Sequence, residues 1–176
     1  MTTHFNLPVA PTSGTSKKSG AIDQRFLTFS LGAESYAVPL PKVREVIAFG
    51  ELTKIPNTPP YFRGIMNLRG QVISVIDLRI KFQLPDAAIT PETAIIILDM
   101  QSLCLGIIID SVDAVLSIPS DSISPPPDHE SAIGLDYVTG VARVNKSLIL
   151  TLDIEKALSV EDLVAMRRSD ASRDVA

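Results

Sequence analysis

The side chains that could carry acid–base or metal chemistry are few. The chain of 176 residues has two histidines, His4 and His129, one cysteine, Cys104, and no tryptophan. Most zinc sites and acid–base pairs draw on several His or Cys residues. His4 lies in a polar N-terminal segment, and His129 follows a Pro-Pro-Pro-Asp run that is typical of an exposed loop. We therefore expect no catalytic residue, no cofactor and no metal, and the protein is not expected to be an enzyme.

Motifs for nucleotides and cations are also missing. The sequence contains neither GxxxxGK[ST] nor GxGxxG, and Gly64 and Gly70 are six residues apart with large apolar residues between them, as turn glycines are. Asp110 and Asp113 lie near a strand end, but their spacing lacks the ligand series of an EF-hand loop. Cys104 lies in an apolar run and is expected to be a small core residue. A nucleotide-binding protein stays an alternative that titration with ATP would test.

Charge and hydropathy limit the partners and the compartment. The net charge of -4 and an aromatic content of 5% oppose the basic, stacking surfaces of nucleic-acid-binding proteins, so an RNA-binding β-barrel is the weaker alternative. The longest stretch without a polar side chain, residues 103–109, is far shorter than the roughly 18 residues of a membrane span. No basic segment followed by an apolar one opens the chain, and one cysteine forms no internal disulfide. We expect a cytoplasmic protein with no direct membrane insertion.

Two segments stand out as candidate binding surfaces. In Val43-Arg44-Glu45-Val46-Ile47, two charged residues are set among β-branched ones. This pattern indicates either an edge strand protected by charges or an exposed strip, centred on Val43, that contacts a partner. The second segment is Asn67-Leu68-Arg69-Gly70, which has turn residues before an apolar strand.

An internal repeat contains both segments. Val43 aligns with Val112 at an offset of 69 residues, and Gly64 aligns with Gly140 at an offset of 76, so that about seven residues are inserted before Gly140. Apolar positions keep their parity along both copies, which is the signature of a duplicated unit. Each unit holds about five short strands separated by turns, which predicts a small closed barrel or sandwich. Units of about 65 residues are marginal alone, so we expect the two to pack together or to exchange strands.

Arg69 differs between the two copies. Its counterpart in the second unit is Asn145, so an arginine at this position is not required by the fold of the unit. One interpretation is that Arg69 pairs with a nearby carboxylate such as Glu45 and shapes the turn. A second is that Arg69 binds a partner. The two interpretations are compatible.

The sequence predicts the following division of the chain. Residues 1–22 form a flexible tail, the first unit covers about 23–89 and the second about 94–158. Asp77 is expected to cap one short helical turn. A capping box from Ser159 to Asp162 predicts a helix over 159–168, and residues 169–176 form a polar tail.

These motifs resemble the CheW family of bacterial chemotaxis coupling proteins, over about residues 26–158. The strongest pieces are Phe-Leu-Thr-Phe-Ser-Leu-Gly at 26–32, Lys-Val-Arg-Glu-Val at 42–46 and Gly-Ile-Met-Asn-Leu-Arg-Gly at 64–70. The resemblance implies an all-β fold of two tandem SH3-like five-stranded β-barrels packed together, with a short C-terminal helix. It also implies a non-enzymatic adaptor that couples chemoreceptors to the histidine kinase CheA.

The resemblance further implies where the partners bind. The receptor's cytoplasmic signalling tip would dock in the groove between the barrels, and the receptor-facing or groove-shaping residues would be Val43, Glu45, Gly64 and Arg69. The regulatory domain of CheA would bind the outer ends of the barrels, at residues that the resemblance does not identify. The protein would then be cytoplasmic and associated with membrane-bound receptor arrays.

Three features depart from the family. Pro39 and Pro41 crowd the strand before Val43, Ser74 stands where a proline is common, and the N-terminal tail is long. Related domains occur in the kinase itself and fused to a receiver, but no receiver, ATP-binding or phosphotransfer segment fits in the remaining length. A free-standing coupling protein is therefore favoured. The alternative is a coupling protein of a non-flagellar pathway, with pilus motility or another output.

Overall fold

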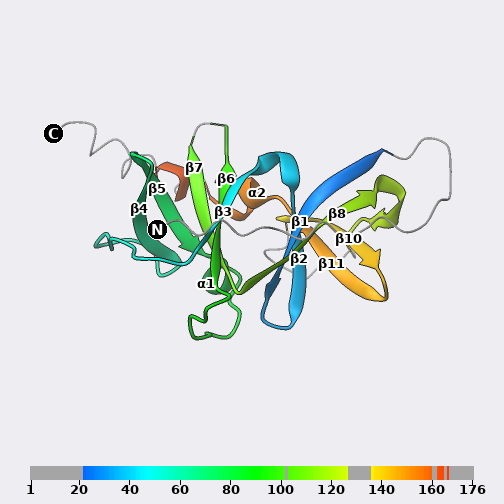
Figure 1. Cartoon of the computed structure of the whole chain (residues 1–176), viewed down its shortest axis with the longest axis horizontal. Coiled ribbons are helices and arrows are strands. Elements are labelled where there is room, and N and C mark those ends of the chain that lie inside the picture. Colours follow the sequence, from blue (N-terminus) through cyan, green and yellow to red (C-terminus); the bar gives the residue numbers. More distant parts are fainter. Residues whose placement is uncertain (1–21, 102, 127–135, 160–161, 165, 167–176) are drawn as a thin grey trace.

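The computed structural model describes residues 22–101, 103–126, 136–159, 162–164 and 166. His4, His129, nearly all of the predicted N-terminal tail and the polar C-terminal tail lie outside the described residues. Figure 1 shows the described part as two groups of strands that lie side by side along the longest axis. Within the described residues, no helix is both long enough and apolar enough to cross a membrane.

Two β-sheets form the two groups, and the all-β prediction is confirmed. The first barrel is a five-stranded sheet, in the order β3 (Val43–Ala48), β6 (Ala94–Asp99), β7 (Cys104–Ile109), β5 (Gln71–Asp77) and β4 (Phe62–Leu68). The second barrel is a six-stranded sheet, in the order β8 (Ser111–Pro119), β1 (Asp23–Leu31), β2 (Glu34–Pro39), β11 (Ser147–Leu152), β10 (Val138–Val144) and β9 (Ile123–Ser124). The short helical elements are η1 (Leu40–Lys42), α1 (Leu78–Lys81), η2 (Ser120–Ser122) and α2 (Ile154–Ala157).

The barrels do not coincide with the sequence repeats, because the repeats exchange hairpins. The hairpin β1–β2 opens the first repeat but lies in the second barrel, and the hairpin β6–β7 opens the second repeat but lies in the first barrel. Two parallel pairings, β5 with β7 and β11 with β2, join each exchanged hairpin to its host barrel. Each barrel therefore depends on strands from both halves of the chain.

The register of the exchanged hairpins confirms the duplication. In the first barrel Val43 lies opposite Leu98, and a β-bulge follows before Glu45. In the second barrel Val112 lies opposite Phe29, and the register shifts at the same place. These pairs are related by the offset of 69 residues that the sequence predicts.

The second half of each repeat is duplicated in the same way. Gly64 pairs with Val75 beside a register shift, and Gly140 pairs with Thr151 beside an equivalent shift. The carboxylate of Asp77 accepts a hydrogen bond from the Arg79 amide at 3.0 Å and caps α1, as predicted. Its counterpart Asp153 caps α2.

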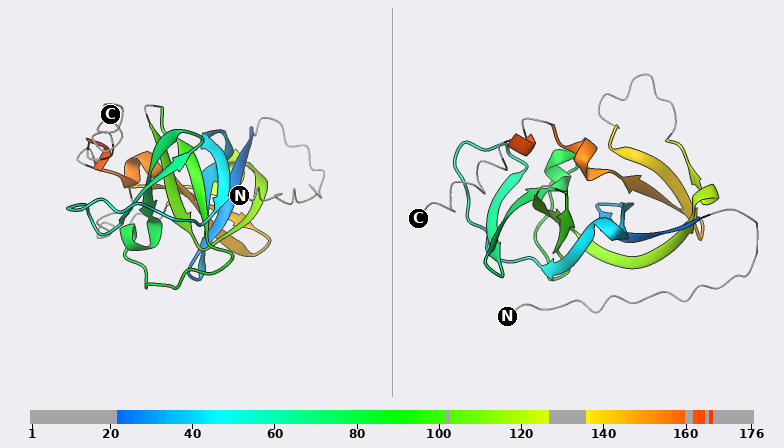
Figure 2. Two further views of the ribbon diagram at one scale, coloured as in Figure 1. Left: turned by 60° about the vertical axis from the view of Figure 1, so that its left-hand side comes forward. Right: turned by 90° about the horizontal axis from the view of Figure 1, so that it is seen from above.

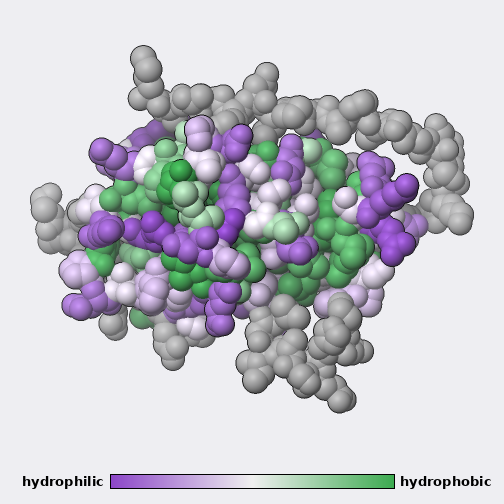
Figure 3. Space-filling view, turned by 90° about the horizontal axis from the view of Figure 1, so that it is seen from below, coloured by the Kyte–Doolittle hydropathy of each residue, from purple (hydrophilic) through white to green (hydrophobic). Residues whose placement is uncertain are grey.

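One hydrophobic core is shared by both barrels, and each barrel also encloses a smaller one. On β6, Ile95 and Ile97 point into the first barrel, whereas Ile96 and Leu98 belong to the shared core. Strands buried on both faces read as continuous apolar runs, which explains the unbroken apolar sequence of β6 and β7. Seen from below, hydrophilic and apolar residues alternate over the first barrel, and a broader apolar area lies over the second (Figure 3).

Candidate functional site

The strand β3 places Val43 and Glu45 at one edge of the first sheet. Val43 is the first residue of β3 and is half-buried against the shared core. The bulge after Val43 interrupts the alternation of side chains between the two faces of β3. Only 13% of the Glu45 side chain is exposed. β3 is an edge strand in the sheet order, as the charged pattern predicts.

Arg69 reaches Glu45 from the turn between β4 and β5. Its guanidinium donates two hydrogen bonds to the carboxylate, from Nη1 to Oε1 at 3.1 Å and from Nη2 to Oε2 at 2.9 Å. The predicted pairing of Arg69 with Glu45 is therefore confirmed. Arg69 adopts a φ of 53°, a left-handed conformation that its repeat counterpart Asn145 shares with a φ of 47°. The turn geometry is thus a property of both copies, and the arginine side chain belongs to the first copy alone.

The ion pair joins the two edges of the first sheet. β3 and β4 are the terminal strands of this sheet, and a second contact beside the ion pair joins β3 to β5 and β7. Arg44 Nη1 donates to Gln71 Oε1 at 2.9 Å and lies 3.0 Å from Cys104 Sγ. The hydrogen bond to Cys104 raises the pKa of Arg44, as do Glu45 and other nearby acids, so the guanidinium stays charged. Cys104 is 8% exposed, as expected for a small core residue.

Gly64 serves the fold of β4. It is buried with a φ of 139°, and a Cβ atom at this position would lie 2.4 Å from the backbone oxygen of Thr53. Thr53 and Ile65 exchange two backbone hydrogen bonds of 2.9 Å across this close approach. Gly140 in the second barrel also lies close to a neighbouring segment, where a Cβ atom would meet Ile123 Cγ2 at 2.5 Å, but its φ is not positive. The structure thus brings Glu45 and Arg69 together, places Val43 on the strand of Glu45, and makes Gly64 a backbone residue that shapes the adjacent loop.

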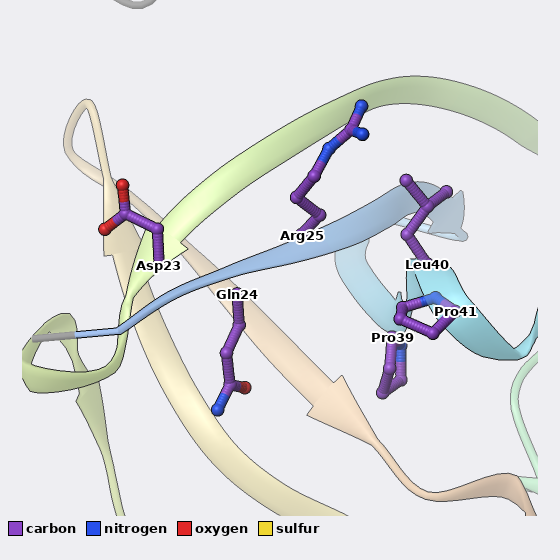
Figure 4. A pocket seen from close by; sticks show the side chains of 6 residues that line it. All are labelled: Asp23, Gln24, Arg25, Pro39, Leu40 and Pro41. Atoms are coloured by element: carbon purple, nitrogen blue, oxygen red, sulfur yellow. The ribbon is translucent and has the colours of Figure 1, made fainter.

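A pocket of about 480 Å³ lies beside the chain segment that leads into Val43. Asp23, Gln24 and Arg25 from β1 form one wall, and residues 39–41 form the other, with Arg25 and Leu40 projecting to the same side (Figure 4). Pro39 and Pro41 were considered in the sequence only for their effect on the strand before Val43, and this pocket was missed. The signal was the Pro-Leu-Pro order, because Pro39 caps the single turn of η1, Pro41 is its second residue, and Leu40 packs against the shared core.

The barrels pack closely against each other at one point of the seam. Residues from both barrels surround a space of only about 10 Å³: Val38, Pro39, Lys42, Leu98, Met100, Leu152 and Ile154. The two barrels are therefore in close contact at this point of the seam.

The acidic pair Asp110 and Asp113 is engaged by protein groups. Asp110 accepts hydrogen bonds from Arg79 and from the Gly32 amide, and Asp113 accepts from the Ser30 hydroxyl at 3.0 Å. Within the described part of the chain, no group of three or more His, Cys, Asp or Glu residues is placed to hold a metal ion.

Comparisons with known proteins agree with this architecture. The family model described as CheW-like domain matches residues 25–162. The chemotaxis protein CheW of Klebsiella aerogenes is 36% identical over 149 residues, which cover 84% of this chain and 90% of the relative. The chemotaxis protein CheW of Treponema pallidum is 33% identical over 80% of this chain and 86% of the relative.

A solved structure has the same fold. The crystal structure of the scaffolding protein TtCheW from Thermoanaerobacter tengcongensis superimposes with a TM-score of 0.74 and 33% identity, over 80% of this chain and 96% of that one. With the two strand-exchanged barrels and the Glu45–Arg69 pair in place, these matches settle the family. The chain belongs to the CheW family, whose members are chemotaxis adaptor proteins.

Proposed function

We propose that this protein binds the cytoplasmic signalling tip of a chemoreceptor and the regulatory domain of the histidine kinase CheA at the same time. Binding both partners raises their effective concentration and fixes their geometry, with no chemical step by the adaptor. The protein would act in the cytoplasm at membrane-bound receptor arrays. The broad apolar surface over the second barrel supports a protein-binding role, since such areas mark interaction sites (Figure 3).

The receptor-facing surface would be formed by Val43, Glu45 and Arg69, with Gly64 shaping the loop beside them. Arg69 carries this proposal, because its side chain is 61% exposed although its guanidinium is held in one orientation. Two of its five N–H donors point at Glu45, which leaves donors for a partner. A prepositioned arginine binds with a smaller loss of side-chain entropy.

Replacing Arg69 by Asn tests this proposal with little strain, because Asn145 already adopts the same left-handed conformation in the second copy. The matched control is Lys146→Asn, which removes an exposed cation from the equivalent turn of the second barrel. Titrations with a receptor tip fragment and with the kinase regulatory domain report the two interactions separately. We expect Arg69→Asn to weaken receptor binding at least about tenfold, or roughly 1.4 kcal/mol, and to leave kinase binding unchanged. Normal receptor binding by a folded Arg69→Asn protein would overturn the role of Arg69.

A further inference from the structure

The described chain passes between the two barrels three times, and a charged contact lies at each passage. The first passage is η1, between β2 and β3. There Lys42 Nζ lies 3.2 Å from Glu155 Oε1 and 3.9 Å from Asp153 Oδ1, at the start of α2. This contact links the entry into the first barrel with the exit from the second.

The second passage lies between β7 and β8, at Asp110. The carboxylate of Asp110 accepts the Gly32 amide at 2.7 Å from the second barrel and Arg79 Nε at 2.6 Å from the first. Arg79 also donates to the carbonyl of Pro85 at 2.6 Å. One carboxylate thus joins a turn of the second barrel to α1 of the first.

The third passage follows α2, where the chain returns from the second barrel to the first. The predicted capping box is present: the Asp162 amide donates to Ser159 Oγ at 3.1 Å, and the Ser159 amide donates to Asp162 Oδ2 at 2.8 Å. Residues 162–164 and 166 are helical. Figure 2 shows the described residues of this segment, in orange-red, at the first-barrel end of the molecule. We call the described residues of this segment, 159, 162–164 and 166, the strap.

Asp162 fastens the strap to the first barrel. Its carboxylate accepts hydrogen bonds from the Tyr61 hydroxyl and from Lys81 Nζ, the latter at 3.0 Å. Tyr61 precedes β4 and Lys81 lies in α1, so both belong to the first barrel. The Lys81 ammonium also lies 4.1 Å from the centre of the Tyr61 ring. Because Asp162 is only 9% exposed, removing one partner would leave a poorly solvated charge.

Apolar contacts reinforce this fastening. Met166 is 1% exposed and Leu158 is 6% exposed, and both belong to the core that the two barrels share. The strap differs from the other two passages because it follows the last strand. The strand ladders of both sheets are complete without it, so its release costs no inter-strand hydrogen bond.

We propose that the strap is a latch that sets the angle between the two barrels, with the Tyr61–Lys81–Asp162 cluster as its catch. Opening the catch frees the C-terminal end of the second barrel from the first while both barrels stay folded. A binding surface over the seam changes shape when this angle changes, so the latch gives the molecule two discrete arrangements. The inference concerns the geometry of the chain and does not depend on which partners bind.

Spin-label distances in the full chain test the latch. The labels are attached at two exposed strand residues, Ala48→Cys on β3 and Arg143→Cys on β10, in a Cys104→Ser background. With the catch intact, we expect a narrow distribution of distances between the two labels. Asp162→Asn is expected to broaden or shift this distribution. The matched control is Asp121→Asn, which makes the same chemical change at an exposed residue of η2 and is expected to leave the distribution unchanged.

Hydrogen exchange shows whether the strap has opened. In Asp162→Asn we expect exchange of the Leu163 amide, which donates to the Ser159 carbonyl, to accelerate at least about tenfold, while the Ile96 amide of β6 stays protected. Lys81→Met removes the other half of the catch and is expected to give the same result. This second variant keeps the test valid if Asp162→Asn fails to fold. A strap that opens with no change in label distance would overturn the proposal. So would a strap that stays closed in both variants.

Discussion

Arg69 binds the carboxylate of Glu45 through two hydrogen bonds of 3.1 and 2.9 Å, and it does so from a residue with a φ of 53°. The two side chains differ in environment, since 61% of Arg69 is exposed and 13% of Glu45. Ion pairs this accessible to water contribute about 0–1 kcal/mol to stability. The pair therefore serves mainly to hold the arginine in position at the edge of the first barrel.

The double substitution Glu45→Arg with Arg69→Glu separates structure from recognition. It restores an ion pair of opposite polarity, so we expect the free energy of unfolding to stay within about 1 kcal/mol of the original protein in denaturant titrations. Receptor-tip binding should stay weak, because the exposed charge now has the opposite sign. Recovery of binding in the double variant would show that receptor binding needs only an ion pair at this edge of the barrel and does not need the arginine itself.

Gly64→Ala tests the role of the close backbone approach in β4. The new Cβ atom would lie 2.4 Å from the Thr53 oxygen, at a φ of 139° that disfavours side chains. We expect a loss of at least about 3 kcal/mol in the free energy of unfolding, measured by denaturant titration.

The matched control for Gly64 is Gly70→Ala. Gly70 also has a positive φ, of 86°, but no atom lies within 4 Å of the position of its Cβ. The expected loss is about 1–2 kcal/mol, from backbone conformation alone. Equal losses at the two glycines would show that the contact with Thr53 yields easily and that Gly64 is not fixed by it.

Asp110 predicts a pH dependence of stability. Burial raises the pKa of its carboxyl, but the hydrogen bonds from Arg79 and the Gly32 amide outweigh this effect and hold the pKa below its usual value of 3.8. The stabilisation is therefore complete above the unfolded pKa and is lost as the pH falls through the lower folded pKa. At pH 7 we expect Asp110→Asn to lower the free energy of unfolding by about 1–2 kcal/mol.

Unfolding measured between pH 7 and pH 2 checks the sign. The difference between the original protein and Asp110→Asn should stay constant down to about pH 5 and shrink below pH 3.8. Asp121→Asn is the control, and its difference from the original protein should be small at pH 7. A difference for Asp110→Asn that grows on acidification would contradict a lowered pKa.

Much of the architecture could be predicted from local sequence patterns. Alternating and continuous apolar runs identified the strands, Asp77 identified the turn of α1, and the spacing of Ser159 from Asp162 identified the capping box. The duplication followed from two offsets that the register reproduces. The sequence offered Glu45 as one example of a nearby carboxylate that could pair with Arg69, and the structure contains this pair.

The exchange of hairpins could not be placed from the sequence. The pairings of β5 with β7 and of β11 with β2 join residues far apart in the chain, and the apolar pattern of a strand does not specify its neighbour. The role of Gly64 depends on the close approach of the Thr53 backbone, and no local sequence motif predicts that approach. Its presence in both copies, as Gly64 and Gly140, was the signal for a structural role.

The aromatic contact between the barrels gives the last prediction. The rings of Phe82 and Tyr137 stack with centroids 4.4 Å apart and planes 2° from parallel, and Phe82 also lies 6.0 Å from Tyr36. Phe82 follows α1 of the first barrel, whereas Tyr36 and Tyr137 belong to the second. The repeat places Leu158 at the position equivalent to Phe82, so Phe82→Leu installs a side chain that the duplicated unit already accepts.

We expect Phe82→Leu to lower the free energy of unfolding by about 1–2 kcal/mol, because the stacking and part of the buried area are lost while an apolar side chain remains. Tyr137→Phe is the control, since it keeps the stacked ring, and it should change stability by less than Phe82→Leu. Because the contact joins the barrels, Phe82→Leu should also shift the label distance between Ala48→Cys and Arg143→Cys. A loss of stability with an unchanged distance would place the role of Phe82 within the first barrel alone.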